Sequence, residues 1–143
     1  VDTAGSGTAG LLSSFAGDVV IEDSTFSART SSSGDAGTVE FITSGDITLR
    51  ASDVSSSTIG NPALDAGNAG NVRVDTDGNL NLLDGSTIRA NSQTAGRGGD
   101  VSVVAAGTVF LDGGSSISSD SFDRGDSGLV SIFAGNLILD ATR

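Results

Sequence analysis

The sequence predicts an all-β protein, a right-handed parallel β-helix (β-solenoid) of about five coils with three short strands in each coil. Short stretches in which apolar and polar residues alternate recur along the chain and are separated by glycines, as is typical of strands and turns. The pattern then repeats at an offset of roughly 29 residues, for example from Gly70 to Gly99. A coil requires such an offset because each strand lies on its equivalent one turn later, whereas an antiparallel sandwich does not.

The repeat units begin at glycines and contain further glycines before the second and third strands. In the third unit, alternation follows Gly70, Gly78 and Gly85, and the fourth unit repeats this arrangement. Coils are therefore predicted to start near residues 10, 37, 70, 99 and 128, with spacings of 27, 33, 29 and 29 residues.

Alternation also identifies the side chains expected to face inward and to stack in layers. In the third unit the outward partners, Arg73 and Asn81, are polar, as a solvated outer surface requires. The predicted inward residues are Val39, Phe41, Ile47, Leu49 and Val54; Val72, Val74, Leu80, Leu82 and Ile88; and Val101, Val103, Val109, Leu111 and Ile117.

The residue after the second glycine of each unit predicts a ladder of turn side chains. These residues are Asp18, Asp46, Asn79, Thr108 and Asn136. Asn and Asp hydrogen-bond the backbone at turns, and stacked Asn side chains can bond from one strand layer to the next.

The first and last units share a variant form, since residues 10–18 and 128–136 each have one residue fewer between their glycines than the other units. This match suggests a super-repeat of four coils. We therefore expect residues 1–143 to form one solenoid segment of a longer array. We find no capping element, so end-to-end self-association is expected.

The longest departure from the repeat predicts a protruding loop at residues 56–68. It contains Ile59, Asn61, Leu64 and the single proline, Pro62. Ile59 and Leu64 are expected to tuck back against the coil. Ile59, Asn61 and Pro62 are the candidate residues for contact with a partner.

Composition excludes several functional classes. The chain has 18 acidic and 7 basic residues, a net charge of −11, which argues against nucleic-acid binding and against an anionic membrane surface. No apolar run is long enough to span a bilayer. Because His and Cys are absent, catalytic triads and thiol chemistry are excluded. No enzyme activity and no cofactor are expected, although carboxylates alone serve some β-helix polysaccharide-active enzymes.

Two motifs suggest ligand sites, and each is better interpreted as a turn. Asp75 and Asp77 resemble the start of a calcium loop, but the closing Glu is missing, so calcium binding is expected to be weak at most. Arg124, Gly125 and Asp126 form the tripeptide that integrin ligands display on loops. Glycine and aspartate are abundant in this chain, so we favour a plain surface turn there.

The residues that carry the repeat also carry a family resemblance. Residues 98–103 (Gly-Gly-Asp-Val-Ser-Val) and 82–90 (Leu-Leu-Asp-Gly-Ser-Thr-Ile-Arg-Ala) resemble the repeats of filamentous-haemagglutinin-like large exoproteins, the two-partner secretion adhesins, especially the cyanobacterial type. The resemblance covers nearly the whole chain. It implies a parallel β-helix, export across a bacterial outer membrane, and an adhesin or extracellular filament on the cell surface. The secretion domain of that family is not visible in this sequence.

The sequence therefore predicts a structural stalk or filament segment of a secreted bacterial surface protein. The alternative is a module that binds a glycan or receptor through its loops. A polysaccharide-active enzyme fragment is the second alternative.

Overall fold

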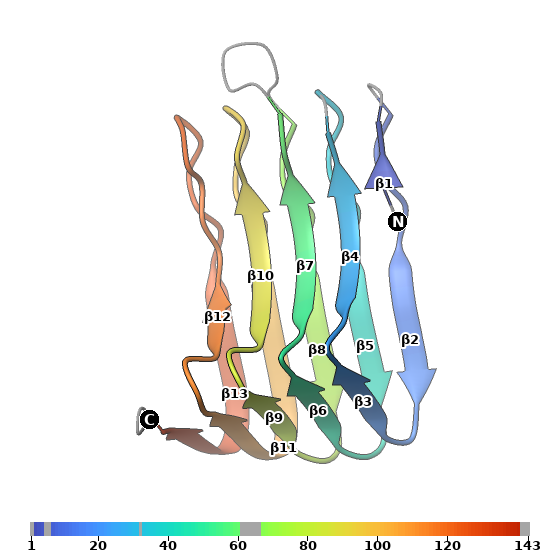
Figure 1. Cartoon of the computed structure of the whole chain (residues 1–143), viewed down its shortest axis with the longest axis vertical. Coiled ribbons are helices and arrows are strands. Elements are labelled where there is room, and N and C mark those ends of the chain that lie inside the picture. Colours follow the sequence, from blue (N-terminus) through green and yellow to red (C-terminus); the bar gives the residue numbers. More distant parts are fainter. Residues whose placement is uncertain (1, 5–6, 32, 61–66, 141–143) are drawn as a thin grey trace.

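The computed structural model describes residues 2–4, 7–31, 33–60 and 67–140, and its strands form a β-solenoid. All pairing between strands is parallel, and the described residues contain no helix. Figure 1 shows the coils side by side, from the N-terminal coil to the C-terminal coil. The predicted fold class is confirmed.

The first three coils each contain three strands, as predicted. The first coil has β2 (Leu12–Ala16), β3 (Val19–Glu22) and β4 (Thr25–Thr30); the second has β5 (Val39–Thr43), β6 (Ile47–Arg50) and β7 (Asp53–Thr58); the third has β8 (Val72–Thr76), β9 (Leu80–Leu83) and β10 (Thr87–Ser92). A short strand, β1 (Asp2–Thr3), pairs with β4 and precedes the first coil.

The fourth and fifth coils differ from the prediction of three separate strands. Here the first two strands merge into one, β11 (Val101–Leu111) and β13 (Val130–Leu139), with a register shift between Ala105 and Thr108. The third strand is β12 (Ser116–Ser118) in the fourth coil, and the described part of the fifth coil has none.

The strands form two sheets that run along the stack. One sheet has the order β1-β4-β7-β10-β12, and the other follows β2-β5-β8-β11-β9-β6-β3, with β13 paired to β11. The register matches the predicted coil starts, because Val39 pairs with Leu12 and with Val72, and Val101 pairs with Val72 and with Val130. Each coil therefore lies on its equivalent residues, and the predicted spacings are confirmed.

The core is a column of aliphatic layers inside the coils. All the predicted inward residues are buried except Leu111 and Ile117, which are partly buried against the same cluster. Ile117 is less covered because the described part of the fifth coil has no strand beside β12, whereas Leu111 has Leu139 beside it. Phe26 and Phe41, in the first two coils, are in tilted ring contact, with 4.6 Å between the ring centroids.

Beyond the aliphatic layers, the coils also bury side-chain hydroxyl groups. The sequence analysis did not predict that these residues face inward. Thr58, Ser92 and Thr94 are fully buried. Thr58 Oγ1 donates to Ser92 Oγ at 2.9 Å, and Thr94 Oγ1 donates to the carbonyl of Gly67 at 2.8 Å. These bonds satisfy the polar groups that the coil buries at this corner.

The predicted loop at residues 56–68 is shorter than expected. Ser56 and Thr58 belong to β7, and the Ser56 hydroxyl donates to the Gly37 carbonyl at 2.7 Å inside the coil. Gly67 is buried as well. The prediction failed at these ends because inward hydroxyls were taken for loop residues. Of the remainder, residues 61–66 lie outside the described residues.

A row of stacked glycines, the glycine row, fixes the corner where each coil begins. It consists of Gly10, Gly37, Gly70, Gly99 and Gly128. A Cβ atom on any of the last four would lie closer than 3.0 Å to the carbonyl oxygen of the glycine one coil earlier, whereas one on Gly10 would meet nothing within 4 Å. Only glycine permits this backbone approach.

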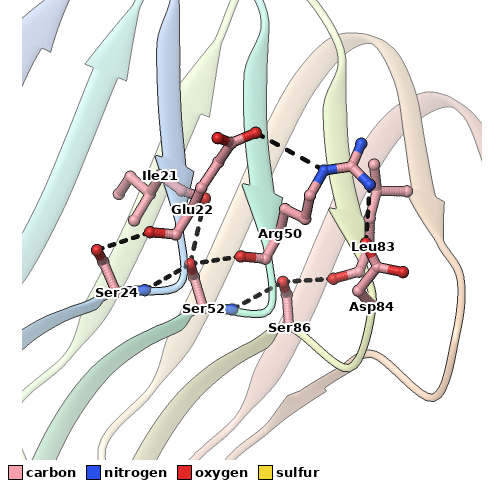
Figure 2. A network of polar contacts seen from close by, with 8 residues as sticks. All are labelled: Ile21, Glu22, Ser24, Arg50, Ser52, Leu83, Asp84 and Ser86. Carbon is pink, nitrogen blue, oxygen red and sulfur yellow. Dashed lines mark hydrogen bonds and ion pairs between the residues drawn. The ribbon is translucent and has the colours of Figure 1, made fainter.

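A different arrangement forms the turn before the third strand. Figure 2 shows Ser24, Ser52 and Ser86 in successive coils. The Ser24 amide donates to Ser52 Oγ at 3.1 Å, and the Ser52 amide donates to Ser86 Oγ at 3.2 Å. The serine hydroxyls thus cap amide groups that the turn leaves without strand partners.

The residues just before these serines have left-handed backbone conformations. Asp23 and Ala51 each have φ of 47°, and Asp84 and Gly85 have φ of 55° and 75°. Arg50 crosses this turn and contacts Asp84 at 2.8 Å and Glu22 at 3.7 Å, so one side chain joins three coils (Figure 2). These ion pairs are exposed and add little stability individually.

Candidate functional site

The predicted side-chain ladder exists at the turn between the first and second strands. Asp18 Oδ1 accepts the amide of Asp46 at 2.9 Å, and Asp46 Oδ1 accepts the amide of Asn79 at 2.7 Å and its side-chain Nδ2 at 3.0 Å. Asn79 Oδ1 then accepts the amide of Thr108 at 2.8 Å. Each oxygen therefore bonds the coil that follows it.

Glycines next to this ladder make room for its side chains. A Cβ on Gly45, Gly78 or Gly107 would lie closer than 3.0 Å to the carboxylate or amide oxygen of the preceding coil. The second glycine of each repeat unit is thus explained by the ladder beside it.

Two further ladders flank the glycine row, and the sequence analysis did not identify them. In one, Asn68 donates its amide to Asp35 Oδ1 at 2.8 Å and accepts the amide of Arg97 at 2.9 Å. In the other, Asn71 Oδ1 accepts the amide of Asp100 at 2.9 Å. The available signal was the regular spacing of polar residues on both sides of the unit-start glycines.

These two ladders border an open polar groove over the third to fifth coils. Its volume is about 360 Å³, and its floor is formed by Gly98, Gly99 and Gly128. Asn68, Asn71, Arg97 and Asp100 line its sides. The amides of Asn68 and Asn71 are used between coils, and Asp100 Oδ1 likewise accepts the amide of Leu129 at 2.8 Å, so the Arg97 guanidinium is the charged group that a polar ligand in this groove would meet.

The Arg124-Gly125-Asp126 tripeptide lies in a turn that belongs to the coil. A Cβ on Gly125 would lie closer than 3.0 Å to the Gly96 carbonyl, and the Asp126 carbonyl accepts the amide of Gly98 at 2.9 Å. The side chains of Arg124 and Asp126 are exposed, and Asp126 is 3.8 Å from Arg97. The close contact between coils therefore explains why residue 125 is a glycine, and a ligand-binding role is not needed to explain it.

Asp75 and Asp77, the two candidate calcium ligands, lie in different elements and have different partners. Asp75 lies on β8 and forms an ion pair with Arg73 at 2.8 Å, while Asp77 lies in the following turn and donates its amide to the Thr43 carbonyl. In the described part of the chain, no three acidic side chains come together in a group that could hold a metal ion.

Of the predicted partner-contact residues, only Ile59 can be placed. It is partly buried, and its amide donates to the Thr30 carbonyl at 2.9 Å, as expected for a residue that stays against the coil. Asn61 and Pro62, together with Leu64, lie outside the described residues.

The chain was also compared with known proteins. It matches no family model, no curated protein and no solved structure. Among the residues that the structure describes, no helix is long and apolar enough to cross a membrane.

The ladder at Asp46 gives a direct test of its stabilising role. Asp46→Ala should lower the free energy of unfolding by about 1 kcal/mol, because the Asn79 amide and side chain lose their acceptor. Asp46→Asn is the matched control, since it keeps an oxygen at the same position and should retain most of the stability. Urea denaturation followed by circular dichroism measures both. Equal losses in the two variants would show that the hydrogen bonds of the ladder are not what stabilises this turn.

Proposed function

We propose that this chain is a non-catalytic stalk or filament segment of a secreted bacterial surface protein, of the filamentous-haemagglutinin-like type. One observation supports the proposal above all. The polar side chains at the turns bond the next coil, from Asp18 through Asp46 and Asn79 to Thr108. Groups engaged in this way serve the continuity of the rod and are not available to a substrate.

A stalk works by length and stiffness, and the solenoid supplies both. Each coil adds about 4.8 Å along the axis, the spacing of neighbouring strands. Because the first four coils bond one another through two sheets and several ladders, bending would break many hydrogen bonds together. The net charge of −11 also reduces non-specific adhesion to other acidic surfaces.

The expected partner of this segment is another solenoid end, most simply a second copy stacked end to end. Leu137 and Leu139 pair with the inward residues Val109 and Leu111, yet they are 51% and 67% exposed because no coil covers them. Apolar inward positions left open in this way favour stacking of another coil.

We predict that Leu137→Asp with Leu139→Asp will abolish the concentration-dependent growth of assemblies larger than a dimer in light scattering, since the charges oppose a covering coil. Ile138→Asp, on the outward side of the same strand, is the control and should leave growth unchanged. A wild-type chain that stays monomeric at high concentration would contradict end-to-end stacking.

The polar groove favours one alternative, a binding module for a glycan or receptor. Arg97 offers a charged donor on an accessible surface. On this alternative the stalk would also carry a ligand, with residues 59–65 as a second contact region.

A glycan array and a cell-adhesion assay separate the two proposals. For a stalk segment we expect no retained glycan and no adhesion above background. Binding that is lost on Arg97→Ala, or on deletion of residues 59–65, while the circular dichroism spectrum is unchanged, would replace the stalk by the binding module.

A further inference from the structure

One outer surface of the rod departs from the polar exterior expected of a solvated solenoid. The strands β2, β5, β8, β11 and β13 lie side by side along the rod (Figure 1). Their register aligns one outward residue from each coil into a row, which we call the outer row. It consists of Phe15, Ile42, Asp75, Val104 and Phe133.

Four of the five members of the outer row are apolar; three of these are exposed, and Ile42, like Asp75, is half-buried. Phe15 and Phe133 are 70% and 68% exposed, and Val104, in an interior coil, is still 38% exposed. Phe41, Val74 and Val103, which precede Ile42, Asp75 and Val104 in the chain, are at most 1% exposed, so the alternation places the outer row on the side away from the core. Exposed large apolar side chains that are aligned along one outer face are a feature of interaction surfaces.

The residues beside the outer row carry little charge. The parallel outward row contains Ser13, Glu40, Arg73, Ser102 and Ser131. The two rows together thus hold two acids and one arginine, and Arg73 lies 2.8 Å from Asp75 and 3.4 Å from Glu40. In a chain with a net charge of −11, this is a surface on which two copies can approach without strong repulsion.

The order of residues along the outer row is symmetric about the third coil. Phenylalanine occupies both ends, an aliphatic residue follows on each side, and Asp75 stands at the centre. In a two-fold contact, residue i of one copy meets residue j of the other and residue j meets residue i, so two antiparallel rods would bring Phe15 of each copy opposite Phe133 of its partner. In this row, apolar residues meet apolar residues, and the paired Arg73 and Asp75 of each copy meet at the middle.

We propose that the outer row is a lateral self-association surface that receives a second copy of this chain, with the two rods side by side. This contact is independent of the stalk proposal and of end-to-end stacking. It buries the exposed phenylalanines of both copies and keeps the third coils opposite one another.

The test places one cysteine in a chain that otherwise has none. Asp75→Cys lies at the midpoint of the row, so two copies paired laterally bring their cysteines together. Sheets packed face to face lie about 10 Å apart, which is too far for a direct disulfide. A short bis-maleimide should therefore link Asp75→Cys chains into dimers. End-to-end stacking cannot do so, because it separates these residues by about 24 Å, five coil spacings.

Two controls make the outcome specific. Arg89→Cys places a cysteine in the same coil but on the other sheet, on a side chain 45% exposed, and should give no more dimer than random collision. Adding Phe15→Ser and Phe133→Ser to Asp75→Cys should reduce the dimer at least tenfold, while circular dichroism confirms that the fold is kept. Equal cross-linking of Asp75→Cys and Arg89→Cys, or no effect of the serine substitutions, would overturn the proposal.

Discussion

The close backbone approach along the glycine row is the constraint on which the rest of the structure depends. At this corner the carbonyl of one coil occupies the space that a side chain of the next coil would need, as between Gly70 and Gly99. Glycine alone fits there. Because the corner is fixed in every coil, the strand that follows it starts in register, and the inward residues of β5, β8 and β11 stack in layers.

Coils of different length differ at other turns, and the corner formed by the glycine row is the same in each. The second unit is longer than the others, yet Val39 pairs with Val72 as regularly as Val72 pairs with Val101. Its extra residues lie between Thr58 and Gly67, whereas the third unit has one residue more than the second at the turn that contains Asp84 and Gly85. Insertions at turns leave the sheets intact because the hydrogen bonds between coils are made by the strands and by the ladder side chains.

The sequence allowed the coil period and the core to be predicted, because glycine spacing and apolar alternation record two strong constraints, backbone contact and burial. Val72 and Leu80 follow directly from them. The same reasoning failed at Ser56 and Thr58, since hydroxyl groups satisfied by a carbonyl or another hydroxyl can also face inward. It could not place the groove beside Arg97 either, because that groove is formed by ladders from three coils.

The structure divides its polar and apolar groups in a way that bears on function. Polar side chains at the turns are engaged in joining coils, whereas exposed apolar groups such as Phe133 and Leu139 lie on the outer surface and at the C-terminal coil. Both features favour assembly with other solenoids over chemistry on a small substrate. Their common basis is the register that the glycine row imposes.

The role of the glycine row is tested most directly by comparing the stability of Gly99→Ala with that of Gly10→Ala in thermal and urea unfolding. The added methyl group at residue 99 would collide with the Gly70 carbonyl, whereas at residue 10 it would meet nothing within 4 Å. Gly99→Ala should lower the free energy of unfolding by about 3 kcal/mol or prevent folding, since the backbone must shift to relieve the overlap. Gly10→Ala should change it little. Equal stability of the two variants would contradict the claim that the glycine row sets the stacking of the coils.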